Sequence, residues 1–578
     1  MELLRKINYI FNRRQKIRLL QLTIIILIGA FWELLGVSAI LPFIDVLMDP
    51  KTINHKSYLK FFYDLLEFES SKQFMIFLAI VLILIYIIKN IYIAVMYDAQ
   101  YKFTFRNQKR ISSKLFNCYL RQEYSFHLKH NSADLLRNIS NDVGMFFQVV
   151  LSFLQLLTEL CVCVVLFVFL LLMDKTITIG VTLILAIFAL IFVKVFQKKL
   201  KSMGNTNRKY LAEMNKWMLQ GFGGIKEIKV MGRENYFCNQ YDMAYFYYAE
   251  SQRKYSLLGI LPRPVMEMVC VTALLLVVTI KLMRGVYMQY FVTTLSVFAV
   301  AAFRMLPSFN RLTTYLNTIM FNQGAVDNVY KDLKLIEKLS QNESENGIDT
   351  VELPFEKQIS INNLTFRYPG IDKPVLKKVN LQIPKNASVA FIGTSGAGKT
   401  TLVDIILGIL EPQEGTISVD NLNAKSSIKS WQKKFGYIPQ TIYIMDDTLK
   451  NNITFGLSPD KVDDEQLWNA IEEAQLKEFV LELPDGVNTV IGEAGMRLSG
   501  GQRQRIGIAR VLYNQPEILV LDEATSALDN ETEAAIMQAI DNFSGKKTMI
   551  IIAHRLTTVK NCDIIYRVDH QKVVKSSI

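Results

Sequence analysis

A glycine-rich segment, GTSGAGKT at residues 393–400, has the spacing of a loop that holds nucleotide phosphates. It follows the strand-like run SVAFI and precedes the helix-like run TTLVDIILGIL, which is the setting that such a loop requires. The glycines allow backbone N–H groups to wrap the phosphates, and the start of the helix adds partial positive charge. Lys399 is suited to reach the β and γ phosphates, and the Thr400 hydroxyl can bind Mg²⁺. We therefore predict an ATP site formed by Gly393, Thr394, Ser395, Gly396, Ala397, Gly398, Lys399, Thr400 and Thr401.

An apolar run, ILVLDE at residues 518–523, ends in two carboxylates. Asp522 is predicted to hold Mg²⁺ directly or through water, and Glu523 to polarise the attacking water as a general base. An acidic pair after a strand is common and carries little weight alone. Together with the phosphate loop it predicts a site that hydrolyses ATP bound with Mg²⁺.

A third segment, LSGGQ at residues 498–502, is the signature of ATP-binding cassette (ABC) proteins, and the chain resembles that family over its whole length. The resemblance implies that Tyr368 in FRYPG stacks on adenine and that Gln440 in GYIPQ contacts the metal and senses the transport domain. It also implies that Asp529 in SALD lies in the dimer-contact loop and that His554 in IIAHR contacts the γ-phosphate. Taken singly, these residues could be a core aromatic, a turn residue or a strand-end histidine, but six motifs in family order argue against that.

The signature also bears on assembly. In ABC proteins, the residues that match Ser499 and Gly501 approach the γ-phosphate held by the other subunit, so one chain does not complete a site. We therefore expect contacts to the partner's ATP from Ser499, Gly500, Gly501 and Gln502. Because this chain has a complete set of motifs, two identical copies would form two competent sites, and a homodimer is predicted. A related half-transporter as partner remains an alternative.

The elements around these motifs divide the chain by composition. Apolar residues make up 51% of the 578 residues and form runs long enough to cross a bilayer only before residue 310. Basic residues before the first run and after the second and fourth place these segments in the cytoplasm, which explains a net charge of +12 without a nucleic-acid partner. Six candidate spans cover residues 19–48, 74–96, 149–173, 176–195, 257–283 and 286–309.

The predicted fold is a membrane α-helical bundle of the exporter type, with six spans, fused to a cytoplasmic α/β P-loop nucleotide-binding domain. We expect a transmembrane domain at residues 1–325 with two long cytoplasmic helical loops, a linker at 326–354, and the ATPase domain at 355–578. The loop tips at 124–143 and 220–236 are predicted docking elements, the first with Ser132 as helix cap; plain solvated loops are the alternative. Six cysteines have no metal-ligand spacing and fit a reducing setting.

Charged residues inside the spans are the clue to the transported molecule, because they are costly there and usually face a cavity or a partner. Glu33 interrupts the first span, and three cations lie in later ones. A cavity lined with cations suits a phosphate or pyrophosphate head group. We therefore predict that substrate is bound by Lys89, Arg263 and Arg304. The alternative is that these cations reach an interface or pair with Glu33 or Glu267.

The external segment at residues 58–68 places Tyr58, Phe61, Phe62, Leu65 and Phe68 at helical spacing, which suits a short helix in the outer membrane interface. The membrane half resembles bacterial flippases for lipid-linked oligosaccharides, which implies export of an amphipathic anionic lipid across the bacterial inner membrane by an ATP hydrolase. A multidrug or general lipid exporter of the same architecture and a regulated channel are alternatives. An ATP-dependent nucleic-acid-binding protein would have the ATPase motifs but no spans.

Overall fold

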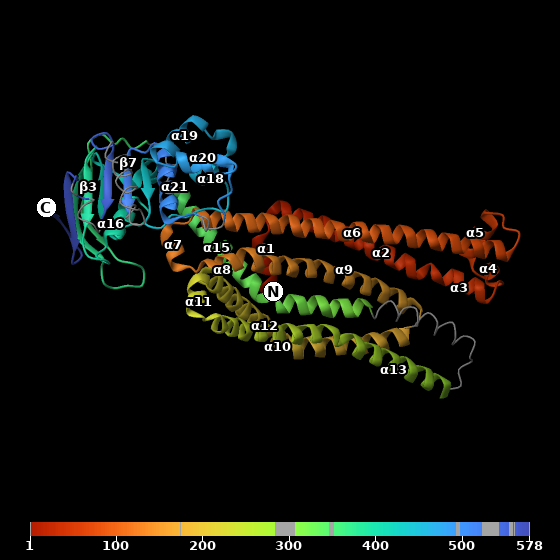
Figure 1. Cartoon of the computed structure of the whole chain (residues 1–578). Helices are drawn as coiled ribbons and strands as arrows, with labels where there is room; N and C mark the ends of the chain where they lie inside the picture. Colours follow the sequence, from red (N-terminus) through yellow and green to blue (C-terminus); the bar gives the residue numbers. More distant parts are fainter. Residues whose placement is uncertain are drawn as a thin grey trace. The chain divides into compact units, whose positions relative to one another are not determined.

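The chain forms two compact units in a computed structural model that describes residues 2–173, 175–283, 307–345, 352–492, 498–522, 543–553, 559 and 561–576 (Figure 1). The membrane unit contains Met1–Gln122 and His130–Asn342. The ATPase unit contains Glu123–Lys129 and Glu343–Ile578. The backbone therefore passes between the units after Gln122, after Lys129 and after Asn342.

The membrane unit is helical. Three of its helical stretches are long and apolar enough to cross a membrane among the described residues: Arg13–Met48, Ser71–Arg121 and Ser132–Leu172. The fourth predicted span lies in α10, the fifth runs from the end of α12 through α13, and most of the sixth, 286–309, lies outside the described residues. The helices are α1 (Glu2–Ile10), α2 (Arg13–Ser38), α3 (Ile40–Met48), α4 (Thr52–His55), α5 (Ser57–Leu65), α6 (Ser71–Arg121), α8 (Ser132–Arg137), η1 (Asn138–Asp142), α9 (Val143–Met173), α10 (Lys175–Gly223), α11 (Ile225–Met231), α12 (Glu234–Ile260), α13 (Pro262–Met283), a helix at 307–321, and α15 (Gln323–Glu345).

The long helices pack side by side in two sets, α2 with α6 and α9, and α10 with α12 and α13 (Figure 1). Ala30 and Val37 of α2 are buried against Val162, Leu166 and Leu170 of α9. These positions recur every four or seven residues, so each helix offers one continuous apolar face to the other. Helices α6 and α10 have 51 and 49 residues, more than twice the length of about 20 residues that a bilayer requires, and they extend beyond it as predicted.

The capped helix inside the first predicted docking element, 124–143, starts one residue earlier than expected. The N-cap of α8 is Asn131, whose side chain accepts a hydrogen bond from the backbone N–H of Ala133 at 2.9 Å, whereas Ser132 is the first helical residue. Asparagine and serine are comparable N-caps, so the sequence pattern alone does not separate them. The preceding helix α7 (Tyr124–Lys129) belongs to the ATPase unit.

The ATPase unit is built on two sheets. A four-stranded antiparallel sheet has the order β2-β1-β4-β5, and a six-stranded sheet has the order β10-β9-β3-β8-β7-β6, in which all neighbours except β9 and β10 are parallel. The strands are β1 (Gln358–Phe366), β2 (Leu376–Pro384), β3 (Ser388–Ile392), β4 (Glu414–Val419), β5 (Leu422–Asn423), β6 (Phe435–Ile438), β7 (Ile518–Asp522), β8 (Thr548–Ile552), β9 (Ile564–Asp569) and β10 (Lys572–Ser576).

Both faces of the six-stranded sheet are buried, which explains its nearly continuous apolar strands. In β7, Ile518 and Val520 join a core with the four-stranded sheet, while Leu519 and Leu521 join a second core. The helices of this unit are α16 (Lys399–Ile406), η2 (Ala424–Ser427), α17 (Ile428–Lys433), α18 (Leu449–Thr454), η3 (Pro459–Lys461), α19 (Asp464–Glu473), α20 (Lys477–Glu482), η4 (Gly486–Asn488) and α21 (Gly500–Tyr513).

The expected linker, 326–354, begins as ordered helix, because α15 continues to Glu345. The first turns of α15 are anchored in the membrane unit by Ala325, Val326 and Val329, which are at most 1% exposed. The domain boundaries at 325 and 355 stay predictions.

Candidate nucleotide-binding site

The phosphate loop leaves the sheet at the carboxyl end of β3 and leads into α16, as predicted. The Lys399 ammonium is held inside the loop, where it donates hydrogen bonds to the carbonyl oxygens of Gly393 at 2.9 Å and Thr394 at 3.1 Å. Gly396 and Gly398 have φ angles of +78° and +101°, a backbone conformation that favours glycine. The loop therefore keeps a cation beside backbone N–H groups at a helix start, an arrangement suited to phosphate.

Tyr368 lies beside the start of α16. Its hydroxyl is 3.0 Å from the Thr401 hydroxyl, and its ring packs edge-on against Phe366 at 5.1 Å between centroids. This places an aromatic ring next to the phosphate loop, where the family resemblance requires one. Stacking on adenine stays a prediction.

Asp522 and Gln440 are brought to one edge of the sheet because their strands are parallel neighbours. Ile438 of β6 pairs with Leu521 of β7, so the residues that follow both strands emerge together at the carboxyl edge. Asp522 is 5% exposed, and the Tyr437 hydroxyl points toward its carboxylate at 3.5 Å. Gln440 is exposed.

A second carboxylate near Asp522 was not predicted. Burial, followed by the charge of Asp522, raises the pKa of Asp404 in α16 to about 6. Burial also raises the pKa of Tyr437, and Asp522, Asp404 and Tyr124 of α7 add to it. The signal in the sequence was an acidic residue one turn after Thr400 on the helix that follows the phosphate loop.

These residues fit Mg²⁺ bound with ATP. The Asp522 carboxylate, the Thr400 hydroxyl and the Gln440 amide carry oxygen atoms of the kind that Mg²⁺ prefers, and these three residues would hold the ion. Among the described residues, no three His, Cys, Asp or Glu side chains gather into a metal cluster. When bound, the ion would neutralise charge on the phosphates.

The signature segment forms the start of α21. Ser499 and Gln502 make a capping box, in which the Ser499 hydroxyl accepts from the Gln502 N–H at 3.1 Å and the Gln502 side chain accepts from the Ser499 N–H at 2.8 Å. The box fixes the helix N-terminus, whose N–H groups favour an anion. Three further predicted site residues lie outside the described residues: Glu523, Asp529 and His554.

Two of the three predicted substrate cations have carboxylate partners in the described part of the membrane unit. The Lys89 ammonium is 2.8 Å from the Glu33 carboxylate, and both side chains are nearly buried. Arg263 lies 3.0 Å from Glu267, and this pair is exposed. Arg304 lies outside the described residues. These pairs are the alternative that the sequence left open.

A further ion pair was not predicted. Arg311, in the helix at 307–321, lies 2.8 Å from Glu159 of α9, whose side chain is 4% exposed. Glu159 interrupts the third predicted span, and this single acidic residue in an apolar run was the available signal.

Comparison with known proteins places the chain in a family. A profile of the ABC transporter family matches residues 376–526, and a profile of the ABC transporter transmembrane region matches residues 19–305. The chain therefore belongs to the ABC transporters: it is a multi-pass membrane protein with an ATP-hydrolysing domain. The predicted fold class and ATPase activity are confirmed.

Its relatives indicate the branch of that family. An ATP-dependent lipid A-core flippase of Cupriavidus pinatubonensis (strain JMP 134 / LMG 1197) is 28% identical over 474 residues, 81% of this chain and 78% of that protein. The flippase of the same description from Wigglesworthia glossinidia brevipalpis is 41% identical over 220 residues, 38% of each chain. A solved bacterial Atm1-family ABC exporter with ATP bound has a TM-score of 0.76 at 19% identity and covers 98% of this chain and 95% of its own. The structural match establishes the exporter fold.

Proposed function

We propose that this ABC exporter moves an amphipathic anionic lipid outward from the cytoplasmic side, and that the lipid carries an oligosaccharide. The observation that carries the proposal is the apolar face of α5. Phe61 and Leu65 are 60% and 61% exposed, and Tyr58 and Phe62 are each 49% exposed, while Leu59 anchors the helix in a core with Val46 and Phe74. An anchored helix with such a face suits insertion among lipid chains. The flippase relatives support a lipid as cargo.

A second candidate is a multidrug or general lipid exporter. It is favoured by the ion pairs of Lys89 with Glu33 and of Arg263 with Glu267, because each pair lowers the net positive charge offered to an anionic head group. The two functions differ in what stimulates ATP hydrolysis. Neutral hydrophobic compounds would stimulate the general exporter, and substitutions of Lys89 and Arg263 would be tolerated in it.

We further propose that the active form is a homodimer in a bacterial inner membrane, with both termini and the ATPase unit in the cytoplasm. Helix α7 belongs to the chain's own ATPase unit, whereas the second docking element, α11, belongs to the membrane unit. Around α11, Phe222, Val230 and Met231 are 76%, 82% and 70% exposed. A second copy is the partner that would cover this apolar tip and supply its Ser499 to this chain's ATP.

In the proposed cycle, Lys399 and the loop N–H groups hold the phosphates of ATP, and Asp522, Thr400 and Gln440 hold Mg²⁺. Glu523 orients the attacking water, and His554 contacts the γ-phosphate. Two ATP molecules favour the closed pair of ATPase units, and the docking helices transmit closure to the membrane unit. Hydrolysis of ATP and release of the products let the ATPase units separate and return the membrane unit to its starting conformation.

The test is reconstitution into liposomes that contain a polyprenyl-pyrophosphate glycan. We expect ATP-dependent translocation by the wild type and none by Glu523→Gln. Exchanging Phe61 and Phe62 for serine should lower translocation, whereas Lys60→Ser, on an exposed residue of the same helix, should not. Failure to move or respond to any polyprenyl-linked glycan would contradict the proposal, and stimulation by neutral hydrophobic compounds alone would favour the second candidate.

A further inference from the structure

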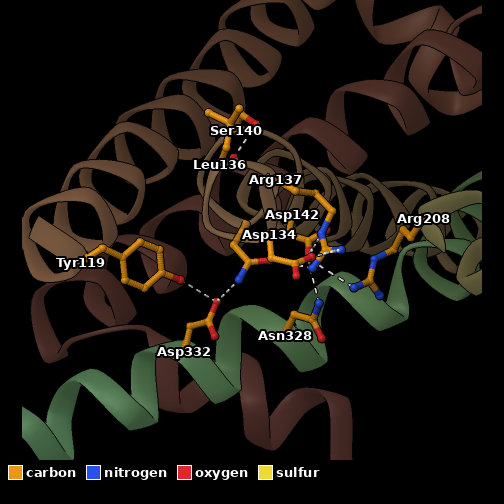
Figure 2. Close-up of polar contacts among 10 residues, drawn as sticks. Tyr119, Asp134, Leu136, Arg137, Ser140, Asp142, Arg208, Asn328 and Asp332 are labelled. Carbon is orange, nitrogen blue, oxygen red and sulfur yellow. Dashed lines mark hydrogen bonds and ion pairs between the residues drawn. The ribbon is translucent and has the colours of Figure 1, made fainter. Parts of the chain in front are cut away.

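A continuous polar network joins four parts of the membrane unit, and we call it the junction (Figure 2). It brings together the end of α6, the α8–η1 segment, α10 and α15. The proposed ATP site uses none of its residues. Its members are Tyr119, Asp134, Arg137, Asn138, Asp142, Arg208, Asn328 and Asp332.

Asp142 is the centre of the junction. Its side chain is 1% exposed, and its Oδ2 atom accepts a hydrogen bond from the Asn328 amide of α15 at 2.9 Å. The same oxygen lies 3.3 Å from the Arg208 guanidinium of α10 and 3.9 Å from that of Arg137 in α8. An isolated buried carboxylate is costly, so these three partners have to stay together for the charge to be tolerated.

Asp332 forms a second centre, one turn further along α15. Its Oδ2 atom accepts hydrogen bonds from the Tyr119 hydroxyl of α6 at 2.9 Å and from the Asn138 amide of η1 at 3.0 Å. Arg137 donates to the Asn138 side chain at 3.1 Å and so links the two centres. Figure 2 shows both carboxylates beside the α15 ribbon.

Close packing of α10 against α15 supports the same contacts. A Cβ atom on Gly324, near the start of α15, would lie 2.2 Å from the Nη1 atom of Arg208. The glycine therefore leaves the space in which Arg208 reaches Asp142. The chain also departs from α-helical geometry here, because η1 is a π-helix. The π-helix is rare in proteins, and where it occurs it is often at a functional site.

The junction lies near each point at which the backbone passes between the two units. The backbone passes between the two units after Gln122, after Lys129 and after Asn342. Tyr119 lies in the last turn of α6, just before the first passage, and Asp134 and Arg137 lie in α8, just after the second. Asp332 lies in α15, which continues as helix through the third passage to Glu345. All three covalent connections therefore start close to one set of linked polar contacts, with the buried Asp142 at its centre.

We propose that the junction makes these three connections move as one body, with Asp142 as the positioning residue that fixes η1 against α10 and α15. The proposal rests on the ATP-driven export cycle above. Buried ionic groups contribute little net stability compared with apolar packing, but in some proteins they specify one arrangement of the elements that hold them, and we assign that role to Asp142. Loss of the Asp142 charge should therefore leave nucleotide chemistry in place and weaken its link to the membrane helices.

The test compares Asp142→Asn with wild type in proteoliposomes. ATP turnover without transported lipid should stay within about twofold, while lipid moved per ATP hydrolysed should fall about tenfold, which is within the usual range of coupling free energies. The matched control is Glu250→Gln, a change of the same charge on the exposed Glu250–Arg253 pair of α12, and it should couple normally. Coupling by Asp142→Asn equal to that of the wild type would overturn the proposal.

A second variant separates coupling from folding. Asp142→Asn combined with Asn328→Asp moves the carboxylate across the 2.9 Å contact onto α15 while keeping an amide opposite to it. This exchange should restore most of the lost coupling. If Asp142→Asn folds poorly, the rescued chain still decides the matter, because a well-folded exchange variant that remains uncoupled would contradict the role of the buried charge.

A third measurement does not depend on the transported lipid. Spin labels at the exposed positions Lys109 of α6 and Asp242 of α12, in the Glu523→Gln background, report whether ATP with Mg²⁺ changes the distance between these helices. Asp142→Asn should reduce this ATP-induced change in distance by at least about twofold. If ATP changes the distance between the labels in Asp142→Asn as much as in the parent chain, the proposed role of the junction is wrong. If ATP does not change that distance in the chain with Asp142 intact, the ATP-driven cycle is contradicted. Failure of the lipid proposal shows instead as a normal shift without glycan transport.

Discussion

Lys89 and Glu33 form an ion pair of 2.8 Å between α6 and α2, and their side chains are only 7% and 9% exposed. The pair is packed closely, since a Cβ atom on Gly36 would lie 3.0 Å from the Lys89 Cδ atom. The Lys89 cation predicted for the substrate therefore has a structural partner. A phosphate group that bound Lys89 would have to compete with Glu33.

Lys89→Ala should destabilise the membrane unit by about 3–5 kcal/mol, because it leaves the Glu33 carboxylate buried without its partner. Glu33→Gln combined with Lys89→Met should recover most of that loss, as judged by thermal unfolding in detergent. Arg263→Ala, at an exposed pair, serves as the control and should change stability by less than about 1 kcal/mol. The neutral double variant also decides the substrate role: normal glycan transport by it would exclude Lys89 as a substrate ligand.

Lys399→Ala should abolish ATP turnover while membrane insertion stays intact, because the ammonium that is held by the carbonyls of Gly393 and Thr394 is lost and no span is touched. Turnover of purified protein is the measurement, with chromatography in detergent as the check of folding. Lys385→Ala, at an exposed lysine of the same unit, should turn over ATP normally. Wild-type turnover by Lys399→Ala would contradict the role given to this lysine.

Gly204→Ala should destabilise the membrane unit. A Cβ atom at this position of α10 would lie 1.8 Å from the Phe321 carbonyl oxygen, so backbone has to move. Gly221→Ala in the same helix is the matched control, since a Cβ atom there meets nothing within 4 Å. The control should be neutral or stabilising by about 0.5–1 kcal/mol, because alanine is the better helix former. Equal melting temperatures for the two variants would show that the close approach of α10 to Phe321 is absent.

Asp404 should make the nucleotide-free ATPase unit less stable as pH rises. Burial and then Asp522 raise its pKa to about 6, above its ordinary value, so between about pH 4 and 6 the folded state binds more protons than the unfolded state. The free energy of unfolding therefore falls as pH rises from about 4 to 6. At neutral pH the whole of this destabilisation by the buried Asp404 carboxylate is present. In the presence of a chelator, Asp404→Asn should melt higher than wild type by roughly 6 °C near neutral pH, with no difference near pH 4. Asp460→Asn, an exposed control, should follow wild type at both pH values.

The parts of the site that the sequence predicted are those with local signatures. The loop at 393–401, Asp522 and Ser499 were found because each motif is a short run of residues beside a recognisable strand or helix. Glu33 with Lys89, and Asp142 with Arg208 and Asn328, depend instead on which helices pack together, and no local pattern contains that information. The sequence placed Asp142 in a predicted docking element and Asn328 in the expected linker, and nothing in it indicated that α10 and α15 bring these residues together.

Complementation between two inactive variants tests most directly the central claim that each ATP site is completed by a second copy. Lys399→Ala removes the phosphate lysine, and Ser499→Arg disrupts the start of α21. Each variant alone should be inactive. Refolded or co-expressed together, they should regain up to about a quarter of wild-type turnover, because half of the dimers would contain one intact composite site of two. A mixture as inactive as either variant alone, in dimers shown to contain both chains, would contradict the account.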